Sequence, residues 1–137
     1  MAGYSDKPLI AKLGIKPGFR VAIVGSPRGF KNELGVLPSG VKFTTTLIEN
    51  LDFILLFVTS ESELKKKFPP VAESLCANGM LWIAWPKKSS GVVTDLSFAN
   101  VQQIGLATGL VDVKICAVNE IWSGLKFVYR LKDRAKR

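Results

Sequence analysis

Basic and hydroxyl side chains gather in three short segments, each of which follows an apolar run. These segments span residues 26–31, 59–61 and 86–91. Arginine offers a planar fork of donors and lysine a point charge, and both suit phosphate or carboxylate groups. The residue types therefore predict a crevice for an anionic small molecule, with a solvated rim of lysines as the alternative interpretation.

Two tryptophans lie next to these segments. Trp85 precedes Lys87, and Trp122 lies in a predicted turn near Lys126. Either indole could stack a ring of the ligand, or it could close the edge of the core with its N–H on a backbone carbonyl. The candidate ligand-binding residues are Arg28, Lys31, Thr59, Ser60, Glu61, Trp85, Lys87, Lys88, Ser89, Trp122 and Lys126.

The composition excludes most forms of side-chain catalysis. The 137 residues contain no histidine, which removes His-based acid–base chemistry and the commonest zinc ligand. A serine nucleophile would need a lysine as its base, and Ser89 and Ser90 lie in a loop that would hold them poorly. We therefore predict no catalytic residue and no metal site. Cys76, in a predicted helix, and Cys116, in a predicted strand, are expected to be reduced, buried thiols.

The net charge of +8 is concentrated at one end of the chain. Residues 130–137 hold five basic side chains and one acidic one, a net +4. Such an excess attracts nucleic acid or an anionic surface, although a basic tail often only increases solubility.

Nothing in the sequence predicts secretion or membrane insertion. Residues 1–8 lack the apolar core of a secretory signal. The longest uncharged apolar run, Phe53–Val58, is far shorter than the roughly 20 residues that span a bilayer. We therefore expect a cytoplasmic protein with no membrane partner.

Six apolar runs bounded by turn residues predict strands, at 18–25, 41–46, 51–58, 80–85, 110–118 and 124–131. A short helical turn is expected at 8–14 and a loop at 26–40. A helix should begin at Ser60, with Glu63 completing a capping box, and end at Asn78–Gly79. Pro69 and Pro70 should break or kink it.

A second helix should run to Gly109, with Asp95 or Ser97 as its cap. Strand–helix–strand units build a parallel sheet, and the short connection before the last strand makes an antiparallel hairpin. We therefore predict one α/β domain over 1–137, an open sandwich with a mostly parallel sheet. Residues 1–17 would form an N-terminal arm and short helix, and 132–137 a basic tail. Ligands of such sheets bind beyond the carboxyl ends of the strands.

Residues 50–131 resemble the second half of the class I methyltransferase fold, a Rossmann-like fold. The resemblance lies in Asp52–Val58, the helix that follows, and Asn78–Lys87, with a reversed last strand. Where that family has a Gly-x-Gly loop after its first strand, this chain has Val24–Phe30. The acidic residue expected after the second strand is also missing, with Glu49 the nearest. These departures predict no cofactor, with S-adenosylmethionine as the alternative.

Nearly the whole chain also resembles a small bacterial family of unknown function, through residues 13–18, 82–88 and 117–127. Our leading hypothesis is a non-catalytic or degenerate Rossmann-like domain that binds an anionic small molecule or a protein partner. A small methyltransferase-like transferase and a nucleic-acid-associated basic module are the alternatives, and a homodimer is compatible with each.

Overall fold

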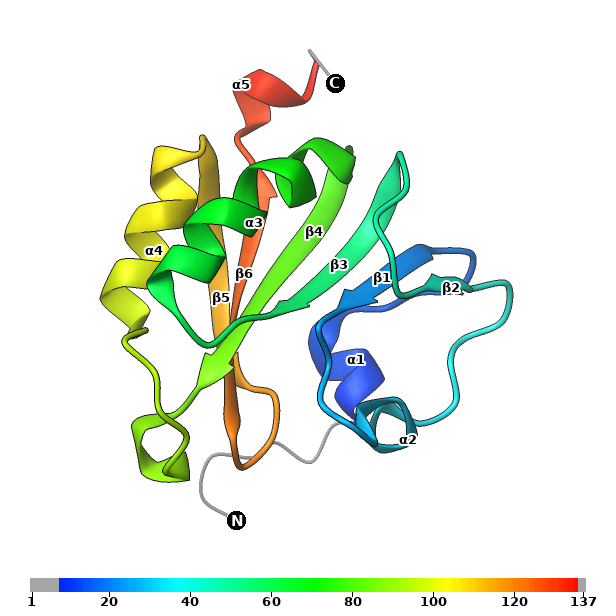
Figure 1. Cartoon of the computed structure of the whole chain (residues 1–137). Coiled ribbons are helices and arrows are strands. Elements are labelled where there is room, and N and C mark those ends of the chain that lie inside the picture. Colours follow the sequence, from blue (N-terminus) through cyan, green and yellow to red (C-terminus); the bar gives the residue numbers. More distant parts are fainter. Residues whose placement is uncertain (1–7, 136–137) are drawn as a thin grey trace.

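The computed structural model describes residues 8–135. The chain runs, in order, through α1 (Leu9–Leu13), β1 (Arg20–Val24), α2 (Phe30–Leu34), β2 (Lys42–Thr44), β3 (Leu51–Phe57), α3 (Glu61–Ser74), β4 (Leu75–Pro86), the 3-10 turn η1 (Lys88–Ser90), α4 (Phe98–Ala107), β5 (Leu110–Ala117), β6 (Trp122–Tyr129) and α5 (Leu131–Arg134) (Figure 1).

The strands form one sheet in the order β2-β1-β3-β4-β6-β5. The first four are parallel, and β6 runs antiparallel to both of its neighbours. The last strand of the chain is therefore inserted between β4 and β5. This arrangement confirms the predicted fold class, a single α/β domain with a mostly parallel sheet and an antiparallel C-terminal pair.

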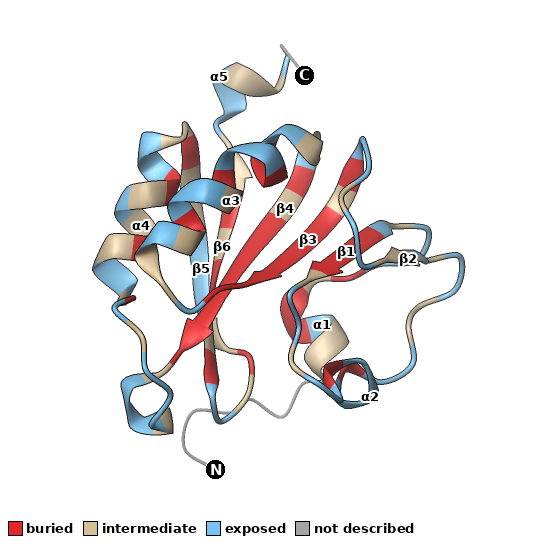
Figure 2. Ribbon diagram, in the orientation of Figure 1, coloured by how far each residue is buried: buried red, intermediate tan, exposed pale blue. Residues whose placement is uncertain are grey.

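Each face of the sheet has its own apolar core. Leu64 and Phe68 of α3 and Val101 of α4 pack against one face, whereas Leu13 of α1 and Phe30 of α2 pack against the other. β3 and residues 81–86 of β4 lie between the two cores and are almost wholly buried, while β5 is largely open to solvent (Figure 2). Burial on both faces explains why β3 and β4 read as continuous apolar runs.

Of the predicted break or kink at Pro69 and Pro70, the break is wrong, because α3 continues through both. A proline in a helix leaves unpaired the carbonyl four residues earlier. Those carbonyls belong here to Lys65 and Lys66, two exposed residues, so water can satisfy them.

The predicted helix end at Asn78–Gly79 is also wrong, since α3 ends at Ser74 and both residues lie within β4. Leu75 already pairs with Leu51, and the register then shifts before Met80 meets Phe53. Gly79 is needed for packing: an added Cβ would lie 2.6 Å from Leu75 Cδ1.

Two further expectations need correction. Cys76 lies in β4 and not in a helix, and both cysteines are free and half-buried, not fully buried. The loop expected at 26–40 contains α2, whose Phe30 and Leu34 lie four residues apart and are both buried. A five-residue helix is too short to give a clear periodic pattern in the sequence.

The ends of the chain are described only in part. Of the predicted arm at 1–17, the first seven residues lie outside the described residues, and the short helix is α1. Of the predicted tail at 132–137, residues 136 and 137 lie outside them, whereas 132–134 belong to α5. Along the described stretch, no helix is long and apolar enough to cross a membrane.

Candidate functional site

The chain reverses its course between β1 and β3, which are neighbouring parallel strands. After β1 it passes to α2 on one face of the sheet and then to β2. After β3 it passes to α3 on the opposite face and then to β4, on the other side. The loops at the two carboxyl ends therefore diverge, and in open α/β sheets ligands bind at such a position. We call this region, residues 25–29 and 58–60, the switch-point crevice.

The wall on the β1 side is a turn that needs glycine. Gly25 has φ +73°, and a Cβ on it would lie 3.0 Å from the carbonyl oxygen of Phe57 at the end of β3. Gly29 has φ +83°, precedes α2 as its N-cap, and has nothing within 4 Å of its added Cβ. The backbone at Gly25 therefore approaches β3 closely, whereas the backbone at Gly29 faces open space.

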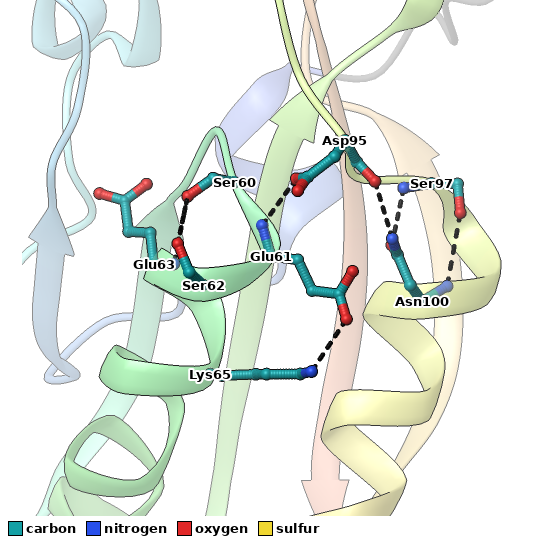
Figure 3. Close-up of polar contacts among 8 residues, drawn as sticks. All are labelled: Ser60, Glu61, Ser62, Glu63, Lys65, Asp95, Ser97 and Asn100. Carbon is teal, nitrogen blue, oxygen red and sulfur yellow. Dashed lines mark hydrogen bonds and ion pairs between the residues drawn. The ribbon is translucent and has the colours of Figure 1, made fainter.

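The wall on the β3 side is the start of α3 (Figure 3). Ser60 Oγ accepts a hydrogen bond from Glu63 N at 3.1 Å, as the predicted cap requires. The Glu63 carboxylate bonds Thr59 N at 2.9 Å, and no bond to Ser60 N completes a capping box. Asp95, from the loop before α4, accepts from Glu61 N at 2.7 Å. Side chains of the protein itself therefore accept hydrogen bonds from most of the backbone N–H groups at the start of α3.

A groove of about 540 Å³ opens beside this helix start. Lys67 Nζ lies 2.8 Å from Glu63 Oε2 within it. Partial burial opposes ionisation of Glu63, but the hydrogen bonds from Lys67 and the Thr59 amide outweigh it and lower the pKa of this carboxyl. The groove is lined by Thr59, Ser60, Ser62, Glu63, Lys66 and Lys67.

Of the predicted ligand-binding residues, Arg28, Thr59 and Ser60 belong to the crevice. Arg28 is exposed in the turn after β1, and Thr59 is exposed after β3. Glu61 turns toward α4 and pairs with Lys65 at 3.0 Å, on the side of α3 away from the groove (Figure 3). Lys31 lies over the Phe43 ring of β2, with its Nζ 4.5 Å from the ring centroid.

Lys87, Lys88 and Ser89 follow β4, one strand farther along the same carboxyl edge. Trp85 is only 4% exposed and belongs to the core under α3 and α4. Trp122 is 9% exposed and packs edge-on against Phe57, with ring centroids 4.9 Å apart. Both tryptophans are therefore buried against the core.

Lys126 does not lie at the carboxyl edge. It sits in the middle of β6, opposite Trp82 of β4. Glu49, the nearest acidic residue to the end of β2, is also elsewhere. Its carbonyl oxygen lies 3.5 Å from an Arg20 nitrogen, at the start of β1, hence at the amino edge.

The sequence did not single out Lys66, Lys67 or Asp95 as site residues. The Glu63–Lys67 spacing of four residues is the usual spacing of a helix pair and was the available signal. Asp95 acts across a separation of 34 residues, which a local pattern does not reveal.

Comparison with solved structures finds the same fold in methyltransferases. A SAM-dependent methyltransferase from Aquifex aeolicus matches with a TM-score of 0.64 and 17% identity, over 87% of this chain and 86% of that one. Magnesium protoporphyrin IX methyltransferase from Synechocystis PCC 6803, with bound SAH, matches with a TM-score of 0.61 and 12% identity, over 89% and 78%.

An O-methyltransferase from neocarzinostatin biosynthesis, in complex with S-adenosylmethionine, matches with a TM-score of 0.64 and 12% identity, over 94% of this chain and 51% of that one. No family model and no curated protein matches the sequence, so the resemblance to a bacterial family stays a prediction.

These structures contradict the prediction of no cofactor, because proteins with this fold were solved with SAM or SAH bound. The prediction rested on a missing glycine motif, whereas the fold is shared although the sequences are only 12–17% identical. The fold of this chain is therefore a shortened class I methyltransferase fold.

Proposed function

We propose that this chain binds S-adenosylmethionine at the switch-point crevice and has a methyltransferase-like function. One observation carries the proposal: at the point where the chain reverses its course, the glycine turn after β1 lies against the end of β3, and a polar groove opens beside the helix that follows β3. The likeness to methyltransferase structures supports it at the level of the fold.

The residues present fit the chemistry of this cofactor. Its amino acid part carries a carboxylate, which suits the Lys66 ammonium group in the groove. The hydroxyl groups of Thr59 and Ser62 can bond the polar edges of the ligand, and open space at Gly29 lets backbone approach it. When bound, the cofactor supplies an electrophilic methyl group for transfer to a nucleophile.

Calorimetric titration with S-adenosylhomocysteine tests the proposal. We expect saturable binding, and a rise in melting temperature of roughly 8 °C at a ligand concentration of about 100 Kd. An unchanged melting temperature and no heat of binding at millimolar ligand would contradict it.

Two neighbouring lysines of α3 supply a matched pair of variants. Lys66 lines the groove, whereas Lys65 faces α4 and pairs with Glu61 (Figure 3). Lys66→Ala should weaken S-adenosylhomocysteine about tenfold through the lost charge-assisted bond. Lys65→Ala should change its Kd by less than about twofold, because exposed pairs contribute little. Equal effects would place the ligand elsewhere.

A non-catalytic anion-binding domain is the second candidate. It is favoured by the state of Glu63, whose carboxylate is held by Lys67 and the Thr59 amide and whose lowered pKa makes it a poor base. This candidate predicts that inorganic pyrophosphate binds and that Arg28→Ala abolishes its binding, with no response to S-adenosylhomocysteine.

A further inference from the structure

A second group of basic residues lies away from the crevice, on the face of the sheet that α1 contacts. Lys114 of β5 and Lys126 of β6 are direct cross-strand partners. Lys114 Nζ approaches the carbonyl oxygen of Lys12 at 3.4 Å. Lys126 Nζ lies 6.0 Å from the centroid of the Trp82 ring, whose Nε1 donates to the carbonyl of Leu13 at 2.9 Å. We define the lysine face as Lys16, Lys114 and Lys126, which are exposed or half-buried, whereas the neighbouring Lys12 is only 9% exposed.

The positive charges of this face act on one another. Within residues 8–135, Lys16, Lys114 and Lys126 form no ion pair. The pKa of Lys126 is lowered, first by its partial burial and then by the charges of Lys114 and Lys16. Keeping these ammonium groups together costs free energy, and a bound anion would offset that cost.

The same side of β6 continues the positive charge toward the C-terminus. Alternate strand residues point to one face, so Arg130 follows Lys126 on this side after Val128. Four residues of extended chain separate the two by about 13 Å. Lys132 and Arg134 of α5 come next, with Arg134 Nε bonded to the carbonyl of Tyr129 at 3.1 Å. A single small anion cannot contact both ends of such a track, whereas a chain of phosphates can.

We propose that the lysine face, with Arg130, binds the phosphate backbone of a nucleic acid strand. Trp82, beneath Lys126, is fully buried and offers no ring for a base to stack on. The lysines would contact phosphates, which carry no sequence information, so binding is independent of sequence. The lysine face lies on β5, β6 and the segment between α1 and β1, apart from the carboxyl ends of β1 and β3, and does not depend on the proposed cofactor.

Fluorescence anisotropy with a labelled oligouridylate RNA of about 20 nucleotides tests this proposal. The double variant Lys114→Gln/Lys126→Gln should bind about tenfold more weakly at about 0.1 M salt. The slope of log affinity against log salt should become less steep by roughly 1.4, because each lost phosphate contact removes about 0.7.

Lys42→Gln/Lys65→Gln is the matched control, since it removes the same charge from β2 and from the opposite face. It should weaken binding by less than about twofold. Equal weakening in both double variants would show that net charge alone attracts the RNA and would overturn the proposal.

Two other results would also overturn it: no binding of the RNA by the unchanged protein at low salt, or binding only to phosphatidylserine vesicles. Lys126→Gln alone checks the fold, because relief of like-charge repulsion should leave the melting temperature equal or higher. Its RNA affinity should still fall.

Discussion

Gly105, in the middle of α4, sets how closely that helix approaches the sheet. A Cβ at this position would lie 2.0 Å from Cε1 of Phe127, a ring that is fully buried and packs edge-on against Phe68. Alanine is the better helix former by about 1 kcal/mol, yet the ring has no free volume into which it could move.

We predict that Gly105→Ala lowers the free energy of unfolding by roughly 2 kcal/mol, the usual cost of overpacking a core. Urea denaturation checks this value. Adding Phe127→Leu should recover part of the loss, because the smaller side chain leaves room for the methyl group. A Gly105→Ala protein as stable as the original would show that α4 can shift outward freely.

Glu63 makes stability depend on pH. Its pKa is lower in the folded protein than its ordinary value, since the bonds from Lys67 and the Thr59 amide outweigh the opposing effect of burial. The contribution is therefore complete above the ordinary pKa and is lost as the pH falls through the folded pKa.

Between about pH 6 and about pH 3, Glu63→Gln should lose less stability than the original protein. The comparison is made by chemical denaturation at each pH. Lys67→Met removes the partner from the same ion pair, so it should flatten the profile in the same direction. Parallel profiles for all three proteins would contradict the assignment.

At the scale of elements, one residue, Asp95, is hydrogen-bonded to the first turns of both α3 and α4. Asp95 Oδ1 accepts from Glu61 N at the start of α3, while its backbone carbonyl accepts from Asn100 of α4 at 2.8 Å. The cap of α4 itself is Ser97, which settles the choice that the sequence left between Asp95 and Ser97. Asp95 thus links the two helices over β3 and β4.

Asp95→Ala should cost about 1 kcal/mol of unfolding free energy, as the loss of a helix cap does. Asp95→Asn keeps an acceptor oxygen and should cost about half as much, because it loses only the charge at the helix start. Thermal unfolding of the three proteins checks the order. If Asn and Ala cost the same, the charge and not the hydrogen bond is what stabilises the helix start.

The elements differ in how far the sequence predicts them. β3 and β4 follow from apolar runs because both of their faces are buried. The end of α3 does not follow, since Asn78 and Gly79 have the composition of a helix cap, and only the pairing of Leu75 with Leu51 extends β4 over them.

The candidate site is predictable to the same degree. Arg28, Thr59 and Ser60 follow β1 and β3, and strand ends can be read from the chain. Lys126 lies apart from them, in the middle of β6 opposite Trp82, and its closeness to Trp122 in the chain does not reveal this position. The prediction of no cofactor rested on the absence of a local glycine motif, and it is contradicted by solved structures of the same fold that contain SAM or SAH.

At the scale of the whole molecule, the sheet depends on its last strand. β6 lies between β4 and β5, so it satisfies the backbone of both, and its Leu125 and Phe127 are fully buried in the core under α3 and α4. A buried Leu or Phe contributes about 2–5 kcal/mol, and whole domains are stable by only about 5–15 kcal/mol.

A chain ended at Ala117 should therefore show no cooperative unfolding transition in urea. A chain ended at Arg130 keeps β6 and loses α5, whose Leu131 is 80% exposed, so it should unfold cooperatively with a loss of less than about 1 kcal/mol. Comparison of these two shortened chains separates the structural role of β6 from that of the basic segment after it. If the chain ended at Arg130 also lost its transition, α5 would be part of the core assembly, and Lys132 and Arg134 would be structural and not available to a phosphate chain.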